Sequence, residues 1–356
     1  MPAPQPRRRG TGWKIFAFVL LLLLVGSMFL NFRQAVRGIR GTKIAGRHTS
    51  AVGPRLEEVT IKESPLETTK KIAVVPIEGV ISGDALQQSE YSLVTVVKEE
   101  LKRAREDDDV KAVLLKVDSP GGEVLASDEI AKAITEFQEK SGKPVVVSMG
   151  SLAASGGYYV SAPCDWIVAN ELTITGSIGV IMHGLNYRGL LDKVGVRPEV
   201  FKSGKYKDML SSTKSPEEIT PEEREMVQKL IDETFQKFKS VVADGRQSAF
   251  THYHGQKLSS DWESFADGRI LSGKEAYKRG FVDEIGDFDT AVKTAKRLAK
   301  IDRADVVQYQ QTFDLSNLFH LFGQTEARNT VKLELGVDIP KLHAGYQYFL
   351  APTYLQ

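Results

Sequence analysis

The stretch VKAVLLKVDSPGG, residues 110–122, is a run of aliphatic and β-branched residues that ends in a glycine turn. Such a run predicts a buried strand. Similar runs at 70–82 and 143–150 predict two more strands, and amphipathic stretches at 91–105 and 127–140 predict helices between them. Because parallel strands need a crossover connection, this alternation predicts an α/β domain built on a parallel sheet.

Weaker patterns extend the domain beyond these elements. Ser127 is expected to cap the second helix, and short apolar runs at 166–170 and 178–182 predict additional strands. TPEE at 220–223 is a capping box with proline at the first helical position, so it predicts the start of a long helix. A last helix is expected over about 288–300.

Residues 13–32, WKIFAFVLLLLLVGSMFLNF, predict a retained single-pass membrane anchor behind a short basic tail at 1–12. No charge occurs from 15 to 30, and a helix of this length spans about 30 Å, the thickness of a bilayer core. A cleaved signal peptide is the alternative, but the run is long for one and no A-x-A-like cleavage site follows it. Arginine and lysine flank both ends, so the positive-inside rule does not decide the orientation.

The rest of the chain divides by composition. The polar segment 33–69 is expected to be a linker, residues 70–305 the folded domain, and residues 306–356 a weakly patterned C-terminal tail. The hydrophobic content of 42% is ordinary for a globular protein, and a net charge of +1 gives no electrostatic reason to expect nucleic-acid binding. A single cysteine, Cys164, allows no intrachain disulfide and is expected to be a packing residue.

A first candidate for chemistry is SLAASGGYY at 151–159, which directly follows a predicted strand. Ser155 stands before two glycines where a helix is expected to begin. That setting suits a nucleophile, because small neighbours admit a substrate backbone and a helix N-terminus favours negative charge. A contact of small residues between a helix and a strand would give the same pattern. The segment is not the G-x-S-x-G elbow of the α/β-hydrolases, because residue 153 is alanine.

Two further segments could complete such a site. DSPGG at 118–122 could present backbone N–H groups to an oxyanion, or could be only a tight turn that needs glycine. KSGKYKD at 202–208 offers lysines, and a lysine can act as a base if burial lowers its pKa from about 10.4 toward neutrality. None of the six histidines stands in a recognisable triad setting, and the spacing of His252 and His254 is not that of a helical metal pair. No metal or cofactor is therefore expected.

Taken together, the motifs DSPGG at 118–122, SLAASGGYYVS at 151–161, TGSIGV at 175–180 and KSGKYKD at 202–208 resemble the signal peptide peptidase A family of bacterial serine peptidases. GRILSGKEAYKRGFVDEIGD at 268–287 is similar to that family's C-terminal signature. Five motifs in the same order make the resemblance specific.

The resemblance covers roughly residues 70–300 and implies a Clp protease/crotonase-like fold with a Ser–Lys dyad. It implies Ser155 as the nucleophile and Lys207 as the general base. Motif matching favours Lys207 over Lys202 and Lys205 without excluding them.

The same resemblance implies supporting roles for three more residues. Ser177 would hydrogen-bond the lysine amine, and Gly122 and Gly156 would supply oxyanion N–H groups. Each motif occurs once, so the chain resembles the short, single-repeat form of the family and not the tandem-repeat long form, in which one repeat brings the lysine and the other the serine. A homo-oligomeric ring is then expected, in which Ser155 of one subunit meets Lys207 of its neighbour. A complete dyad within each monomer is the alternative.

The expected activity is that of a membrane-anchored serine endopeptidase that degrades remnant signal peptides or other short apolar peptides. The family's topology implies a catalytic domain on the extracytoplasmic side of the cell membrane. Two alternatives stay open. A crotonase-type acyl-CoA enzyme would use Glu or Asp for acid–base work, and an inactive membrane scaffold would use no catalytic residue.

Overall fold

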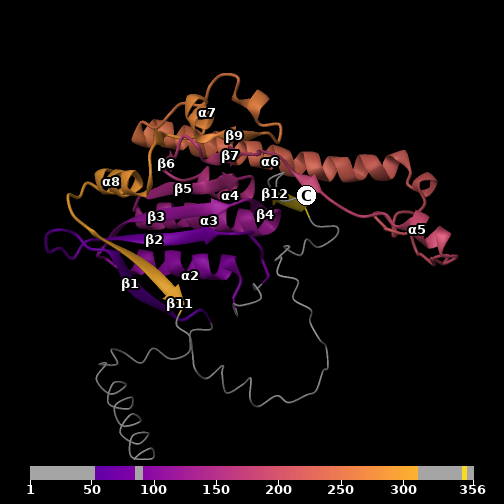
Figure 1. Ribbon diagram of the computed structural model, residues 1–356, viewed down its shortest axis with the longest axis horizontal. Helices are drawn as coiled ribbons and strands as arrows, with labels where there is room; N and C mark the ends of the chain where they lie inside the picture. The colour runs from indigo at the N-terminus through magenta and orange to yellow at the C-terminus, as the bar shows by residue number, and fades with distance from the viewer. Residues whose placement is uncertain (1–52, 85–90, 312–346, 351–356) are drawn as a thin grey trace, which may run out of the picture. The chain divides into compact units, whose positions relative to one another are not determined.

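The computed structural model describes residues 53–84, 91–311 and 347–350 (Figure 1). The predicted anchor at 13–32 lies outside the described residues. Within the described ranges, no helix is both long and apolar enough to span a bilayer.

The core of the fold is a run of parallel strands in the order β2-β3-β5-β6, as the sequence predicted. Their bounds are Lys71–Glu78 for β2, Val110–Ser119 for β3, Val145–Ala154 for β5 and Trp166–Ala169 for β6. The two predicted crossover helices are α2 (Leu93–Glu106) and α3 (Val124–Ser141). The alternation of strands and helices confirms a mixed α/β fold.

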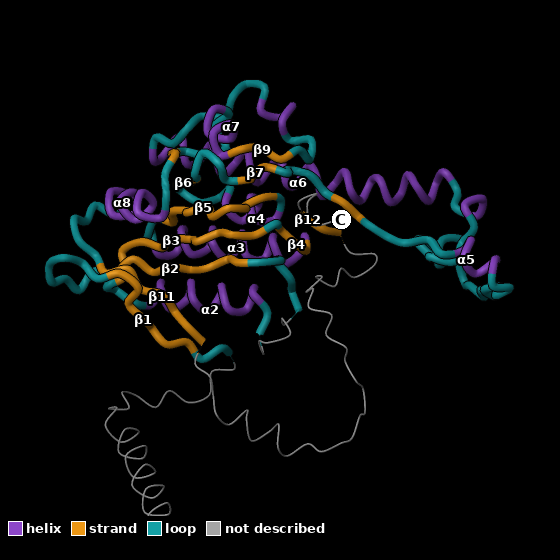
Figure 2. Tube along the Cα trace, viewed as in Figure 1, coloured by secondary structure: helices purple, strands orange, loops and turns teal. Residues whose placement is uncertain are grey.

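Both faces of this sheet are buried, which explains why the strands read as nearly continuous apolar runs. Alternate residues face two separate clusters. Val75 and Leu115 pack on the side of α2 and α3, whereas Val74 and Leu114 pack on the side of α8 (Phe288–Leu298). Figure 2 shows α2 and α3 close to β2 and β3, and α8 apart from these two helices on the left of the view.

The sheet also uses strands from segments that were expected to lie outside the domain. β1 (Leu56–Lys62) falls in the expected linker, and β11 (Asp305–Gln311) continues into the expected tail. β1 pairs antiparallel with β11, and β11 pairs parallel with β2. The strand character of β1 is hard to detect because only Leu56 of its residues is buried. The folded region therefore begins before residue 70 and extends past residue 305.

A second, small sheet has the strand order β4-β12-β8. Its members are β4 (Gly121–Glu123), β12 (Gln347–Leu350) and β8 (Ile181–Met182). The remaining short elements are α4 (Gly156–Ser161), β7 (Ile174–Gly176), the 3-10 turns η1 (Pro216–Glu218) and η2 (Trp262–Phe265), β9 (Ile270–Ser272), α7 (Gly273–Lys278) and β10 (Glu284–Ile285). Of these, β7 pairs with both β5 and β9, and β10 pairs with β6.

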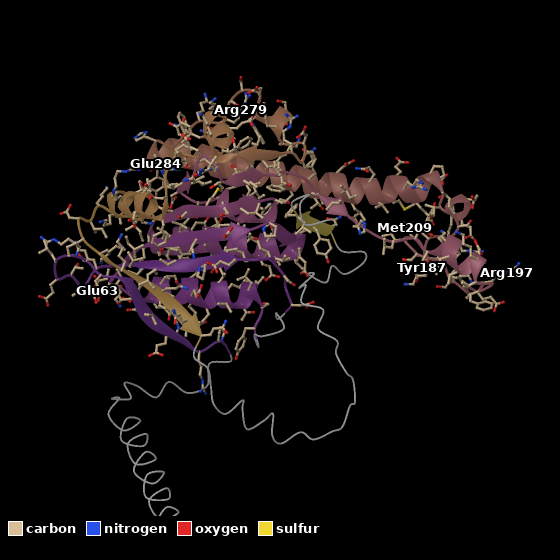
Figure 3. The ribbon with its side chains drawn as sticks, in the orientation of Figure 1. Glu63, Tyr187, Arg197, Met209, Arg279 and Glu284 are labelled. Carbon is tan, nitrogen blue, oxygen red and sulfur yellow. The ribbon has the colours of Figure 1, made fainter. Side chains whose placement is uncertain are left out.

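After β8 the chain forms an arm, defined here as residues 183–230. It contains α5 (Arg188–Lys193) and the first part of the long helix α6 (Pro221–Tyr253). Tyr187, Arg197 and Met209 mark the arm, which lies beyond the end of the sheet (Figures 1 and 3).

Two predicted caps have different outcomes. The capping box of α6 is confirmed, because the Thr220 hydroxyl accepts from the Glu223 N–H and the Glu223 carboxylate accepts from the Thr220 N–H. The expectation that Ser127 caps α3 is wrong. That helix begins three residues earlier, after Glu123, and the Ser127 hydroxyl donates within the helix to the Glu123 carbonyl at 2.9 Å. Helix starts without a side-chain cap leave little local signal in the sequence.

Candidate active site

Ser155 lies in a strained turn between β5 and α4. Its φ of 55° and ψ of −116° are rare for a residue with a side chain, and such conformations cost on the order of 1–3 kcal/mol. The backbone N–H of Ser155 donates to the Gly176 carbonyl at 2.8 Å, and the residue is almost fully buried. The surrounding fold therefore holds this serine in one position, as functional sites commonly do.

The two predicted oxyanion glycines lie beside this turn and touch each other. A Cβ atom placed on Gly156 would come within 2.7 Å of the Ser127 hydroxyl and 3.1 Å of the Gly122 backbone nitrogen. Gly121 has a φ of +97°, and a Cβ there would lie 2.5 Å from the Gly156 nitrogen. No larger residue fits this contact, so the DSPGG and ASGG motifs need their glycines for close backbone approach.

Ser177 lies next to the same turn. It follows Gly176, the acceptor of the Ser155 N–H, and its own N–H donates to the Arg269 carbonyl at 2.7 Å. Its φ of 52° is positive, and the residue is buried. Ser155, Gly156, Gly122 and Ser177 therefore form one group, the serine cluster, although they come from three separate segments of the sequence.

Lys207 lies elsewhere, in the arm, and is exposed. Its backbone N–H donates to the Gly204 carbonyl at 3.2 Å. Within the described part of the chain, its amine has no hydrogen-bond or ion-pair partner, and no hydrogen bond joins it to Ser155. The structure of one chain therefore does not bring the two predicted dyad residues into contact.

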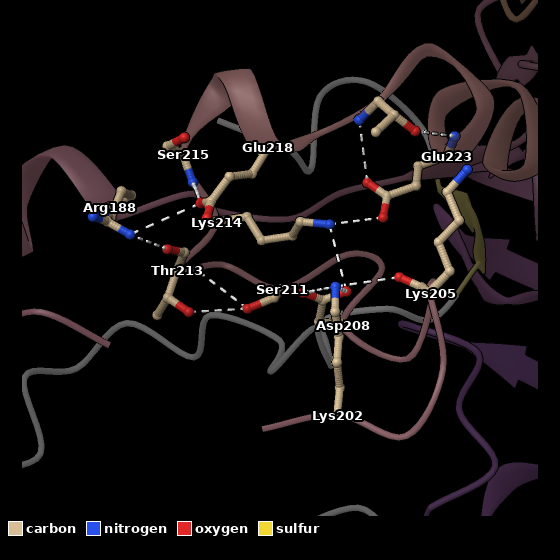
Figure 4. Close-up of polar contacts among 11 residues, drawn as sticks. Arg188, Lys202, Lys205, Asp208, Ser211, Thr213, Lys214, Ser215, Glu218 and Glu223 are labelled. Atoms are coloured by element: carbon tan, nitrogen blue, oxygen red, sulfur yellow. Dashed lines mark hydrogen bonds and ion pairs between the residues drawn. The ribbon is translucent and has the colours of Figure 1, made fainter. Parts of the chain in front are cut away.

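The neighbouring lysines of the arm differ from Lys207 because their amines contact other side chains (Figure 4). The Lys202 amine contacts both carboxylate oxygens of Asp208 at 2.8 Å, and hydrogen bonding from this amine lowers the pKa of the Asp208 carboxyl. The Lys214 amine donates to Glu223 at 2.7 Å, and that hydrogen bond raises the pKa of Lys214.

The Lys205 amine lies over an aromatic ring. It is 4.9 Å from the centre of the Tyr206 ring, and a hydrogen bond with Tyr206 raises the pKa of Lys205. An amine with a raised pKa stays protonated at neutral pH and is a poor proton acceptor.

The single cysteine has a structural role. Cys164 is fully buried, and burial raises the pKa of its thiol, so the expectation of a packing residue is confirmed. Among the described residues, no group of three or more His, Cys, Asp and Glu side chains could hold a metal ion.

The environment on the far side of the glycines was not predicted from the sequence. β12 lies directly against β4, with Phe349 opposite Gly122 and Leu350 opposite Gly121. The Phe349 ring packs between Tyr159 and Phe238. The only local signal for this contact was the cluster of aromatic residues near the C-terminus of the sequence.

Comparison with known proteins identifies the class of protein to which this chain belongs. The pattern of Peptidase family S49 matches residues 137–302, a range that contains both Ser155 and Lys207. A protein of Enterococcus faecium that carries the name signal peptide peptidase SppA is 38% identical over 259 residues, which cover 72% of this chain and 71% of that protein. The chloroplastic serine protease SPPA of Arabidopsis thaliana is 34% identical over 234 residues, 65% of this chain but 33% of that longer one.

The chain is therefore a serine peptidase. It belongs to the signal peptide peptidase A family within family S49. Among solved structures, a mutant of a membrane-bound stomatin-specific protease in complex with a substrate peptide aligns with 72% of this chain and 99% of its own, at 17% identity and a TM-score of 0.43.

Proposed function

We propose that this chain is a membrane-anchored endopeptidase that degrades remnant signal peptides or other short apolar peptides through a Ser155–Lys207 dyad, within a Clp protease/crotonase-like fold. The strained, buried Ser155 beside Gly122 and Gly156 is the observation that carries the proposal. It combines a fixed hydroxyl with backbone N–H groups at the same point, which acyl transfer requires.

In the proposed reaction the neutral amine of Lys207 accepts the Ser155 proton as the hydroxyl oxygen attacks the scissile carbonyl. The N–H groups of Gly122 and Gly156 hold the resulting oxyanion. The protonated lysine then gives its proton to the leaving amine as the peptide bond breaks. Water, deprotonated by the same lysine, attacks the acyl-enzyme and releases the second product with Ser155 restored.

We further propose that the dyad is shared between neighbouring subunits of a ring. The exposed Lys207 amine, free of partners in the described part of its own chain, supports this. The arm that carries it also presents large apolar side chains to solvent, including Phe201 with 90% of its surface exposed and Leu190 with 62%. A second copy that covers the arm would bury these side chains. It would also remove the lysine from water, which favours the neutral form of an amine.

Mixing two inactive variants tests the shared dyad. Ser155→Ala and Lys207→Ala chains should each be inactive alone, and random co-assembly should create an intact pair at roughly a quarter of the ring interfaces. Partial recovery of peptide hydrolysis in the mixture is expected. In the matched control, Lys205→Ala is used in place of Lys207→Ala. Lys205 belongs to the same motif, and this variant should be active by itself. Co-assembled rings that stay inactive would show that the dyad lies within one chain.

Covalent labelling tests the proposed chemistry against the crotonase and scaffold alternatives. A fluorophosphonate probe reacts with an activated serine, so it should label the assembled protein and should not label Ser155→Ala. An acyl-CoA enzyme that uses carboxylates, or an inactive scaffold, would not be labelled at residue 155.

The proposed location rests on the apolar run at 13–32 and on the family's topology. The run should hold the chain in the membrane fraction after alkaline carbonate washing, and removal of residues 1–32 should release it. With an extracytoplasmic catalytic domain, protease added to intact spheroplasts should digest residues from 70 onward. Protection of the domain until lysis would place it in the cytoplasm.

A further inference from the structure

The arm holds a buried network of ion pairs, although it exposes large apolar side chains (Figure 4). The Lys214 and Glu223 side chains are 10% and 5% exposed, and their charged groups meet at 2.7 Å. The same Lys214 amine lies 3.5 Å from the carboxylate of Asp208, whose side chain is 14% exposed. These three residues form the Lys214 network. Removing ionised groups from water is costly unless they are paired, so the three side chains fix one another's positions.

One end of the Lys214 network is the first turn of α6, which the domain holds firmly. The Glu223 carboxylate that receives the lysine also accepts the Thr220 N–H, as part of the capping box. Within the domain, Arg246 of the same helix donates to Asp283 and to the Cys164 carbonyl, both at 2.6 Å. The two charged side chains of this pair are fully buried. Because α6 is one continuous helix, the buried pair also fixes the direction in which its first turns enter the arm.

The other end of the Lys214 network is the loop that carries Lys207. Asp208 is the next residue in the sequence, and both of its carboxylate oxygens accept from the Lys202 amine at 2.8 Å. This pair closes the loop on itself, and the Lys207 N–H donates to the Gly204 carbonyl inside the closed loop. Through Lys214, the closed loop is attached to α6.

The network uses side chains around the proposed base and leaves the base itself available. The ion pairs of the loop are made by Lys202 and Lys214, and the Lys207 amine takes part in none of them. A base that must meet Ser155 needs a fixed backbone and a free amine, because a misplacement of about 1 Å can slow a reaction about 10²-fold. The arrangement of the loop provides both.

We infer that Lys214 is a positioning residue, which sets the place of the Lys207 amine by attaching its loop to α6. Glu223 holds Lys214 on the helix, and Asp208 holds it on the loop. The inference rests on the proposed function of Lys207 as the base. It assigns to Lys214 no contact with the substrate.

The variant Lys214→Met tests the attachment, because methionine keeps an unbranched side chain and removes the charge. For a fluorogenic apolar peptide, kcat should fall about 10²-fold with KM changed less than about twofold, since the base moves while the serine cluster does not. Lys214→Arg keeps the cation and should retain kcat within about threefold of wild type. Lys239→Met breaks an ion pair between α6 and Glu263 outside the arm, and this matched control should leave kcat unchanged. A wild-type kcat in Lys214→Met, or a loss that Lys214→Arg does not restore, would overturn the inference.

Sedimentation analysis separates positioning from assembly and from folding. Lys214→Met should form the same oligomer as wild type, and a loss of activity that follows a loss of oligomer would make the role of Lys214 one of assembly. If Lys214→Met does not fold, Asp208→Asn at the less buried end of the network should show the same fall of kcat at constant KM. A wild-type kcat in Asp208→Asn would contradict the attachment of the loop through this residue.

Limited trypsin digestion tests the attachment without catalysis. In the Ser155→Ala background, Lys214→Met should speed cleavage after Lys205 and Lys207 at least about threefold, because a loop released from α6 opens more often. Lys239→Met in the same background should not change the rate. If Lys214→Met speeds cleavage while wild type resists a fluorophosphonate probe, the proposed catalysis fails and the attachment stands. If wild type is labelled and the cleavage rates are equal, the attachment fails alone.

Discussion

The serine cluster and the arm are built in opposite ways. Around Ser155, backbone groups from three segments are hydrogen-bonded or packed so closely that only glycine fits, and the serine is 1% exposed. The arm has no comparable core, and it exposes Phe201, Leu190 and Val194. The difference indicates that the proposed nucleophile and oxyanion groups are fixed by the fold of one chain, whereas the position of the proposed base, Lys207, depends on what the arm contacts.

The largest expected effect is at Ser155, the proposed nucleophile. Ser155→Ala should lower peptide hydrolysis by at least about 10³-fold with the fold intact, because it removes the hydroxyl that would form the acyl-enzyme. Circular dichroism and a fluorogenic peptide assay measure both properties. Ser151→Ala, four residues upstream and exposed, is the matched control. Activity that survives in Ser155→Ala and disappears in Ser151→Ala would move the nucleophile.

A methyl group at Gly156, in the proposed oxyanion turn, should have the next largest effect. Gly156→Ala places its Cβ within about 3 Å of both Ser127 and Gly122, so the two turns must separate and the N–H groups lose their alignment. We expect kcat to fall about 10²-fold, similar to the loss of one oxyanion donor. Gly184→Ala in the arm meets no atom within 4 Å and should keep full activity. Similar kcat values for the two variants would contradict a rigid serine cluster.

A charge on the arm should have a moderate effect that depends on assembly. Phe201→Asp should weaken oligomerisation and lower activity about tenfold, because a buried charge replaces an aromatic anchor at the proposed contact. Sedimentation analysis and the peptide assay are run across a range of protein concentrations. Leu66→Asp, at another exposed apolar position outside the arm, is the control. An arm variant that remains oligomeric and fully active would remove the arm from the interface.

The smallest effect on activity is expected in the core, at Glu100. This side chain of α2 is buried, one of its oxygens lacks a hydrogen-bond partner, and burial raises the pKa of its carboxyl to about 8. Between the ordinary pKa and this value, the folded state binds the proton that the unfolded chain releases, so stability falls as pH rises. Glu100→Gln cannot ionise. The wild-type free energy of unfolding should therefore drop on the order of 1 kcal/mol more than that of the variant between about pH 6 and about pH 8.

Thermal or urea unfolding at the two pH values measures this difference. Glu106→Gln, an exposed position of the same helix, should behave like wild type. Parallel pH profiles for wild type and Glu100→Gln would show that Glu100 does not titrate in this range.

The features whose causes are local could be predicted from the sequence. The apolar runs of β2, β3 and β5 and the amphipathic spacing of α2 and α3 predicted the α/β order, since a strand buried on both faces has little freedom in composition. The capping box at Thr220 was equally local. Ser155 and its flanking glycines were visible because a tight turn between a strand and a helix needs small residues at consecutive positions.

Which distant segments meet became visible in the folded chain alone. Ser177 reaches the cluster through the bond from Ser155 to Gly176, and β12 pairs with a strand more than two hundred residues away in the sequence. β1 has one buried residue, so its place in the sheet is decided by its partner β11 and not by its own pattern. The pocket around Phe349 joins α4, α6 and β12, and no periodicity within one segment encodes such a contact. Pairing and packing partners are chosen by complementary surfaces that exist only after the chain has folded.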